Sequence, residues 1–169
     1  MKLDLYRSVK HRDRGNVIVH IGTGPGVSIE AIRILRMRGH DVRLVVVGSS
    51  LGLPKAEGVE YRYAIPEKEK LELICRAKAL IFPSISEEPF PYAVIEAVLL
   101  GTIPIVSRVC GVKELLDNTL AFAYMFTPGC VNESVEKTKG VCMLDRSKIT
   151  TFSYELRTEI IKKFNPSKL

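Results

Sequence analysis

The sequence predicts an open α/β fold in which helices cover both faces of a parallel sheet. Four segments are nearly solid runs of strand-forming residues, and such runs indicate strands that are buried on both faces. Helical patterns alternate with these segments, which favours a parallel sheet with right-handed crossovers. The length of 169 residues suits one domain with a sizeable core, so we expect a single domain over residues 1–169.

Five segments are predicted as strands. One of them, Val59–Ile65, alternates between apolar and polar residues, which indicates a strand nearer the edge of the sheet. The four solid runs are Asn16–Gly22, Asp41–Gly48, Ala79–Ser84 and Ile103–Val109.

Helices are predicted between the strands and near the end of the chain. In Ser28–Arg38 the arginines fall largely away from an apolar stripe, as in a helix that packs on a sheet; the stripe consists of Ile29, Ala31, Ile32 and Leu35. Gly39 would end this helix. The other predicted helices are Glu67–Lys78, Pro91–Leu100 and Thr151–Phe164.

The segment from residue 120 to residue 148 is harder to interpret. Within it, residues 121–126 (AFAYMF) resemble a short strand. The polar stretch Asn132–Gly140 reads either as a loop or as a frayed helix.

Composition and charge limit the class of protein. No apolar run approaches the roughly 20 residues of a membrane-spanning helix, and the first residues are too charged for a secretory signal. We therefore expect a cytoplasmic protein. A net charge of +6 suits nucleic acid, an anionic membrane surface or a phosphorylated small molecule. Since the aromatic residues are not interleaved with basic ones, we expect no nucleic acid, while peripheral contact with a membrane stays open.

The four cysteines do not indicate a metal site. They form no C-x-x-C pair, and no histidine lies at a metal-ligand spacing from them. We expect reduced structural thiols and no zinc. The residues are Cys75, Cys110, Cys130 and Cys142.

A glycine-rich turn, Gly22-Thr23-Gly24-Pro25-Gly26, follows the first predicted strand. Such a turn lets the backbone approach a phosphate at a helix N-terminus, although a plain tight turn is the alternative. It is not a dinucleotide fingerprint, because the third glycine would fall at Val27 and the second strand ends without an acid. It is not a P-loop, because no Gly-Lys-Ser/Thr follows.

An acid lies inside an apolar helix. Pro91 suits the first helical position, which would leave the N–H groups of Tyr92 and Ala93 to an anion. Glu88 precedes this helix, and Glu96 lies within it, where an unpaired carboxylate would cost several kcal/mol. Glu96 therefore needs hydrogen-bond donors. Ribose hydroxyls would supply two, and a basic side chain or a backbone N–H is the alternative.

A third loop, Ala64-Ile65-Pro66, follows the edge-like strand. Backbone groups of such a loop can contact a nucleobase. All three loops would lie at the carboxyl edge of the sheet, where open α/β folds bind ligands.

Several motifs occur in a fixed order within Ala79–Leu116. A strand is followed by Pro83-Ser84, then by Glu88 and Glu96 with seven residues between them, and then by Gly101-Thr102. This order resembles the donor-binding region of retaining GT-B glycosyltransferases, the glycosyl transferases group 1 family. The likeness covers roughly residues 16–117 and 151–164. It implies a single Rossmann-like domain that forms one half of a GT-B fold.

The resemblance also implies a role for each matching residue. Glu88 would be the catalytic-site acid that contacts the sugar of a UDP- or GDP-sugar, and Glu96 would hold the ribose. The implied reaction transfers a hexose with retention of configuration and needs no metal or other cofactor; no Asp-x-Asp motif is present. The remaining substrate-binding residues would be Gly22, Thr23 and Gly24 at the diphosphate, Phe90, Pro91 and Tyr92 along the sugar and diphosphate, and Ile65 near the base.

The sequence departs from the family pattern in two ways. Thr23 stands where the family usually has an arginine, and the shortened loop lacks the lysine that follows it. These two cations neutralise the diphosphate, and their loss could cost a few kcal/mol. The family is also built from two domains, with the acceptor site in the other half, so we expect an acceptor domain or a partner chain.

Two main interpretations remain. The favoured one is the donor-binding domain of a glycosyltransferase, and the rival is a degenerate, non-catalytic binding or interaction module. An NAD-type Rossmann protein is disfavoured by the missing ribose acid.

Overall fold

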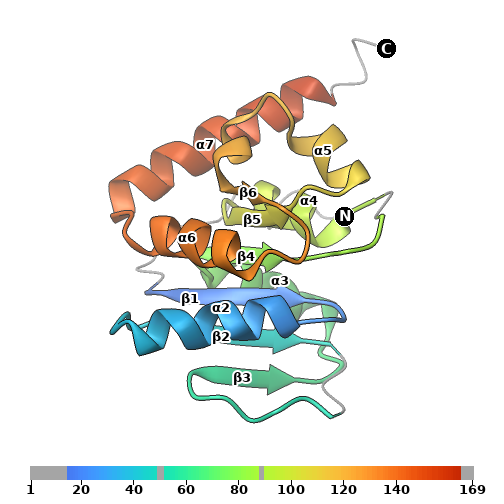
Figure 1. The fold of residues 1–169 in the computed structure, drawn as a ribbon. Coiled ribbons are helices and arrows are strands. Elements are labelled where there is room, and N and C mark those ends of the chain that lie inside the picture. Colours follow the sequence, from blue (N-terminus) through green and yellow to red (C-terminus); the bar gives the residue numbers. More distant parts are fainter. Residues whose placement is uncertain (1–14, 49–51, 88–89, 165–169) are drawn as a thin grey trace.

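The predicted parallel sheet is present in the computed structural model, which describes residues 15–48, 52–87 and 90–164. All strand pairs are parallel, and the strand order is β3-β2-β1-β4-β5-β6 (Figure 1). The edge position expected for the third strand is confirmed. The strands are β1 (Val17–Ile21), β2 (Arg43–Val47), β3 (Val59–Arg62), β4 (Ala79–Phe82), β5 (Ile103–Ser107) and β6 (Met125–Phe126).

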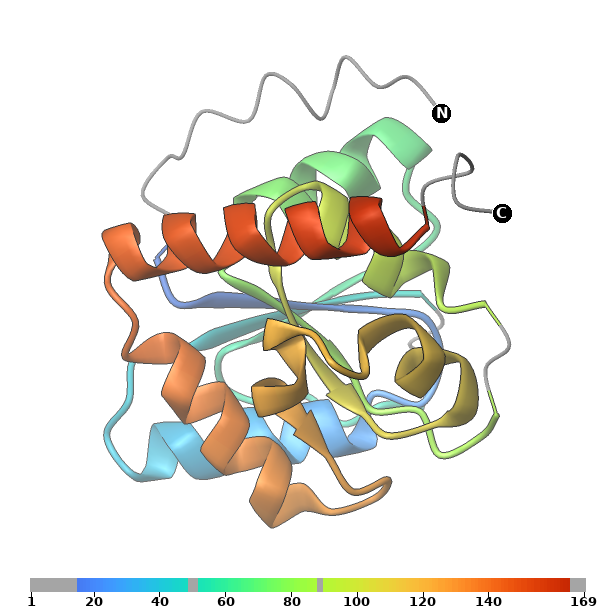
Figure 2. The same cartoon turned by 90° about the horizontal axis from the view of Figure 1, so that it is seen from above.

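Helices cover both faces of the sheet, as the view from above shows (Figure 2). Alternate strand residues supply the two cores: Val19 and Leu80 face one cluster, and Ile18 and Ile81 face the other. The first cluster is covered by α3, α4, α5 and α7, and the second mainly by α2 and α6. The helices are α2 (Gly26–Met37), α3 (Glu67–Arg76), α4 (Tyr92–Leu99), α5 (Cys110–Leu116), α6 (Val131–Cys142) and α7 (Arg146–Lys163), with a 3₁₀ helix, η1 (Leu120–Tyr124).

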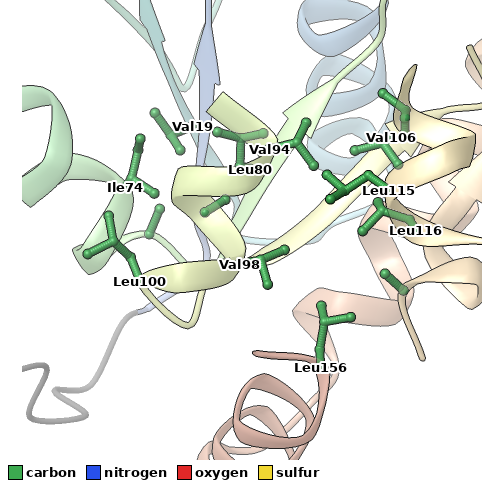
Figure 3. Close-up of a cluster of buried hydrophobic side chains, with 14 of the residues drawn as sticks. Val19, Ile74, Leu80, Val94, Val98, Leu100, Val106, Leu115, Leu116 and Leu156 are labelled. Atoms are coloured by element: carbon green, nitrogen blue, oxygen red, sulfur yellow. The ribbon is translucent and has the colours of Figure 1, made fainter. Parts of the chain in front are cut away.

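Helix α4 lies in the middle of the first cluster (Figure 3). It packs on β4 and β5 and also contacts α3 and α7. Val94 and Val98 are buried against Leu80, Val106 and Leu156. Contact on several sides explains why this helix is apolar nearly all round, and it places Glu96 in a largely dry environment.

Three segments differ from their predicted form. The stretch Asn132–Gly140 belongs to a continuous helix, α6, which buries small polar residues such as Thr138 against α2; the Thr138 hydroxyl donates to the Ser134 carbonyl oxygen at 2.7 Å. Only the last two residues of 121–126 are strand, because the preceding ones form η1. Helix α7 begins at Arg146 instead of Thr151, because the Asp145 side chain accepts the Lys148 N–H at 2.8 Å.

The strand order reverses beside β1, which pairs with β2 on one side and β4 on the other. In open α/β sheets the crevice outside the carboxyl ends of two such strands is the usual ligand site. The loops that leave β1 and β4 at this edge contain the glycine-rich turn and the Glu88 segment.

Other features of the described residues can be stated briefly. None of the four cysteines forms a disulfide. In residues 15–48, 52–87 and 90–164, no helix is long and apolar enough to cross a membrane. The same residues contain no cluster of three histidine, cysteine or acidic side chains that could hold a metal ion.

Candidate functional site

The glycine turn after β1 depends on close backbone packing. Gly22 and Gly24 have φ values of 120° and 67°, which side chains other than glycine adopt rarely. The Gly22 N–H donates to the Val47 carbonyl oxygen at 2.9 Å, and a Cβ atom at Gly48 would collide with the Gly22 carbonyl oxygen. The turn is therefore fixed against the end of β2, and helix α2 begins directly after Pro25 without a side-chain cap.

The side chain of His20, in β1, holds the glycine turn through hydrogen bonds. This side chain is buried; Nε2 lies 3.3 Å from the Thr23 carbonyl oxygen and Nδ1 lies 3.0 Å from the Ser28 hydroxyl. Because a carbonyl oxygen can only accept, we assign the proton to Nε2, and Ser28 then donates to Nδ1. Burial lowers the pKa of His20 to about 4, so the ring is neutral near pH 7 and joins the turn to α2.

The loop after β4 is tied to the next strand and helix. The Ser107 hydroxyl donates to the carbonyl oxygens of Phe82 and Ser84, at 3.3 and 2.5 Å. The Glu87 carboxylate accepts the Cys110 N–H at 2.9 Å at the start of α5, where the helix dipole favours an acid. Glu88, the predicted catalytic acid, lies outside the described residues.

Phe90, Pro91 and Tyr92 lie at the start of α4, as expected. Phe90 and Tyr92 are 63% and 68% exposed, and their ring centroids are 5.3 Å apart, so they present an aromatic surface to solvent. Pro91 precedes the helix and is not its first residue. The expectation that the Tyr92 N–H is free is wrong, because it donates to the Phe90 carbonyl oxygen at 2.9 Å.

Glu96 has a basic partner and a second oxygen without one. The Lys70 amine donates to Glu96 Oε1 at 3.1 Å and lies 3.0 Å from Glu67 Oε2. The Glu96 and Lys70 side chains are only 12% and 20% exposed. Glu96 Oε2 is buried and has no hydrogen-bond partner among the described residues. The alternative in which Glu96 pairs with a basic side chain is thus realised for one oxygen, and the other has no donor among the described residues.

The Lys70 amine keeps its charge in this environment. Burial by itself would lower the pKa of Lys70, but the hydrogen bonds to Glu67 and Glu96 outweigh this effect and raise the pKa above its usual value. Lys70 therefore remains an ammonium group at neutral pH.

Ile65 lies in the loop between β3 and α3, half-buried against the first apolar cluster. Lys70 is in the first turn of α3, directly after this loop, and holds Glu96 from the adjacent helix α4. The structure thus links Glu96 to the helix that follows the Ile65 loop. Glu96 is bonded to Lys70 and not to the glycine turn.

An apolar groove lies on the outer side of α4. It has a volume of about 600 Å³ and is lined mainly by apolar side chains of α4, α5 and α7 and the residues beside them. Phe90 and Pro91 belong to its lining.

Three residues that contact the candidate site could not be identified from the sequence pattern. His20 is hidden in an apolar strand, Lys70 in a run of charged helix residues, and Glu87 beside the more conspicuous Glu88. A histidine in an otherwise apolar strand just before a glycine turn was the one available signal.

Known structures with the same fold include proteins that were crystallised with UDP. HepE of Anabaena, crystallised with UDP and glucose, is 18% identical with a TM-score of 0.76, and the match covers 99% of this chain and 52% of that one. A variant of TarM from S. aureus, crystallised with ligands that include UDP, is 17% identical with a TM-score of 0.77 and coverages of 94% and 34%. The N-terminal domain of Candida albicans trehalose-6-phosphate phosphatase is 16% identical with a TM-score of 0.69 and coverages of 94% and 39%.

These similarities confirm the fold class, a single Rossmann-like domain of the kind that forms half of a GT-B fold. The chain spans about half of the HepE chain and about a third of the TarM chain. Among curated protein sequences, none matches this chain.

A family model described as Glycosyl transferases group 1 matches residues 21–139. The match covers well over half of the 169 residues and includes every candidate site residue. It extends beyond residue 117, where the likeness read from the motifs ended, and does not include residues 151–164. The chain belongs to the Glycosyl transferases group 1 family.

Proposed function

We propose that this chain is the donor-binding domain of a retaining glycosyltransferase, which binds a UDP- or GDP-sugar whose hexose is transferred to an acceptor. Membership of the family and the structural similarity to proteins crystallised with UDP or UDP-glucose support this proposal.

The observation that carries the proposal is the half-satisfied Glu96 carboxylate. A buried carboxylate oxygen without a donor is costly, and Oε2 of Glu96 is in that state. The 2′- and 3′-hydroxyls of a ribose are donors of the right size and polarity. A nucleotide with its ribose at Glu96 would place its base toward Ile65.

The other candidate residues have consistent roles in this proposal. The turn of Gly22, Thr23 and Gly24 faces the diphosphate, with its backbone fixed by His20 and Gly48. Phe90, Pro91 and Tyr92 line the sugar and diphosphate with exposed aromatic surface. Glu88 is the catalytic carboxylate in this proposal and contacts the sugar of the donor.

The diphosphate charge would be met without a metal ion or any other cofactor. The glycine turn leads into the N-terminus of α2, where backbone N–H groups and the helix dipole favour an anion.

The second candidate is a non-catalytic binding or interaction module. It is favoured by Thr23, which stands where the family usually has an arginine, and by the missing lysine of the same loop. Such a module would have the same fold but would not turn over a nucleotide sugar, even when an acceptor domain is present.

The acceptor would be bound by another domain or a partner chain, in keeping with the partial coverage of HepE and TarM. We place the protein in the cytoplasm. Its net charge of +6 would favour peripheral contact with an anionic membrane surface.

A calorimetric titration with UDP, GDP and UDP-glucose tests the proposal. We expect binding of at least one nucleotide, and we expect Glu96→Gln to weaken it about tenfold or more, because a charged acceptor is lost. Glu136→Gln is the matched control, since Glu136 lies on α6 at the opposite face and pairs with Arg38. If none of these ligands gives a heat of binding, only the interpretation as a non-catalytic module remains.

A further inference from the structure

Lys70 is the basic residue most closely connected with the candidate ribose site. It lies in the first turn of α3, and its amine spans the gap to Glu96 on α4. The side chains of Lys70 and Glu96 are 20% and 12% exposed, whereas Glu67, the third member of the group, is 68% exposed at the rim. An inner pair is thus shielded by protein, and an outer carboxylate remains in water.

The charge balance excludes one role for this lysine. Two carboxylates surround one ammonium, so the group carries a net charge of −1 if all three are ionised. Such a group does not attract a diphosphate, and Lys70 therefore does not replace the phosphate-binding arginine whose position Thr23 occupies.

The geometry favours a different role. Lys70 occupies Glu96 Oε1, while Oε2 is buried and without a partner among the described residues. An ion pair in a dry environment restricts the rotamer of the carboxylate. Oε2 is then the oxygen left for a hydroxyl donor, in a fixed position.

We propose that Lys70 is a positioning residue for ribose recognition: its ion pair with Glu96 directs Oε2 toward the ribose hydroxyls of the nucleotide. This inference rests on the proposed function. It makes Lys70, on helix α3, responsible for the preference for ribose over deoxyribose. Lys70 acts through Glu96 and not by contact with the sugar of the donor.

The test compares UDP with 2′-deoxy-UDP and 3′-deoxy-UDP, and UDP with uridine, by calorimetry on the full chain. For the unmodified protein we expect the loss of a hydroxyl to weaken binding roughly ten- to a hundredfold, the value of a hydrogen bond to a charged acceptor. For Lys70→Met we expect the ratio of the Kd for deoxy-UDP to the Kd for UDP to fall toward one. The ratio of the Kd for uridine to the Kd for UDP should stay as in the unmodified protein. Lys70→Arg, which retains the charge, should restore most of the ratio.

Glu67→Gln is the matched control, because it removes the outer partner of the same amine and leaves the inner pair. We expect it to keep the preference for ribose. If Lys70→Met does not fold, as judged by circular dichroism, Lys70→Gln replaces it under the same criteria.

The outcomes separate the two proposals. If the unmodified chain binds neither UDP nor GDP, the proposed function is wrong, and this inference falls with it. If it binds nucleotides and prefers ribose, but Lys70→Met keeps the same ratio and only lowers the melting temperature, Lys70 is merely structural and the proposed function stands. If it binds UDP and the deoxy analogues equally, Glu96 does not recognise the ribose and the inference is overturned.

Discussion

His20 and Glu96 are polar side chains inside an otherwise apolar part of the domain, and specific partners satisfy them to different degrees. His20 has a partner at each ring nitrogen, whereas Glu96 has a partner at only one oxygen. A fully satisfied group stabilises one conformation, while a half-satisfied one is a candidate for ligand contact. We therefore regard His20 as support for the site and Glu96 as part of it.

The neutral state of His20 predicts a pH-dependent stability. The pKa is about 4 in the folded protein and near 6.5 in the unfolded chain, so only the unfolded chain binds this proton at intermediate pH. The free energy of unfolding should therefore fall as the pH is lowered from about 6.5 to about 4, by roughly 3 kcal/mol from this group. Urea titrations of the unmodified protein and of His20→Gln would measure the difference.

His40→Gln is the control for this prediction, because His40 lies in the turn after α2, away from the glycine turn. It should lose stability with falling pH as the unmodified protein does. An identical pH dependence in His20→Gln and the unmodified protein would show that His20 does not carry the effect.

Glu88→Ala should change sugar discrimination more than nucleotide affinity. In the proposed site this carboxylate contacts the transferred sugar and not the nucleotide, so its removal should weaken binding of UDP-sugar and leave binding of UDP nearly unchanged. Parallel calorimetric titrations with the two ligands would measure this. Equal losses for both would contradict the assignment.

At the scale of elements, the junction between the ends of β1 and β2 determines the shape of the glycine turn. The backbones of Gly22 and Gly48 pack directly against each other, since a Cβ atom at Gly48 would collide with the Gly22 carbonyl oxygen. The missing side chain at Gly48 is therefore as important for the turn as the glycines within it.

Gly48→Ala should destabilise the domain and weaken nucleotide binding. The new Cβ would strike the Gly22 carbonyl oxygen, and the φ of 140° is also unfavourable for alanine. Gly129→Ala separates the two effects, because Gly129 also has a positive φ, of 77°, but has open space around it. We expect the control to cost about 1–2 kcal/mol and to keep nucleotide affinity, and Gly48→Ala to cost more. Thermal unfolding and calorimetry would measure both, and equal effects of the two variants would contradict the role of the junction.

At the scale of the whole molecule, the described residues form one parallel sheet with a single carboxyl edge. A GT-B-like active site would form between this edge and an acceptor-binding domain, which the partial coverage of HepE and TarM is consistent with. Binding and turnover should therefore be separable in this chain.

The isolated chain should bind a nucleotide sugar without turning it over. UDP-glucose should raise the melting temperature by mass action, since it binds the folded state. Release of UDP, followed by chromatography over hours, should stay at the uncatalysed level. Hydrolysis or transfer at ordinary enzyme rates would show that the site is complete without a second domain.

Much of the fold could be predicted from the sequence because it depends on local patterns. Solid runs of β-branched residues predicted the central strands, and the alternation in Val59–Ile65 predicted an edge strand. Helix α6 was not resolved by its pattern, because Ser134 and Thr138 are polar residues that become buried against other elements. The start of α7 depended on a cap at Asp145 that the apolar pattern does not contain.

The sequence by itself determined the first five strands, the helices α2, α3 and α4, the glycine turn, and the presence of an acid in an apolar helix. Only the tertiary structure decided what that acid contacts. Lys70 is 26 residues from Glu96 in the chain, and Ser28 in α2 reaches His20 in β1 only because the glycine turn brings the start of the helix back to the strand. Local spacing governs hydrogen bonds along one helix or strand. Which side chains meet between elements depends on how those elements pack, and this packing gave one Glu96 oxygen a partner and left the other buried without one among the described residues.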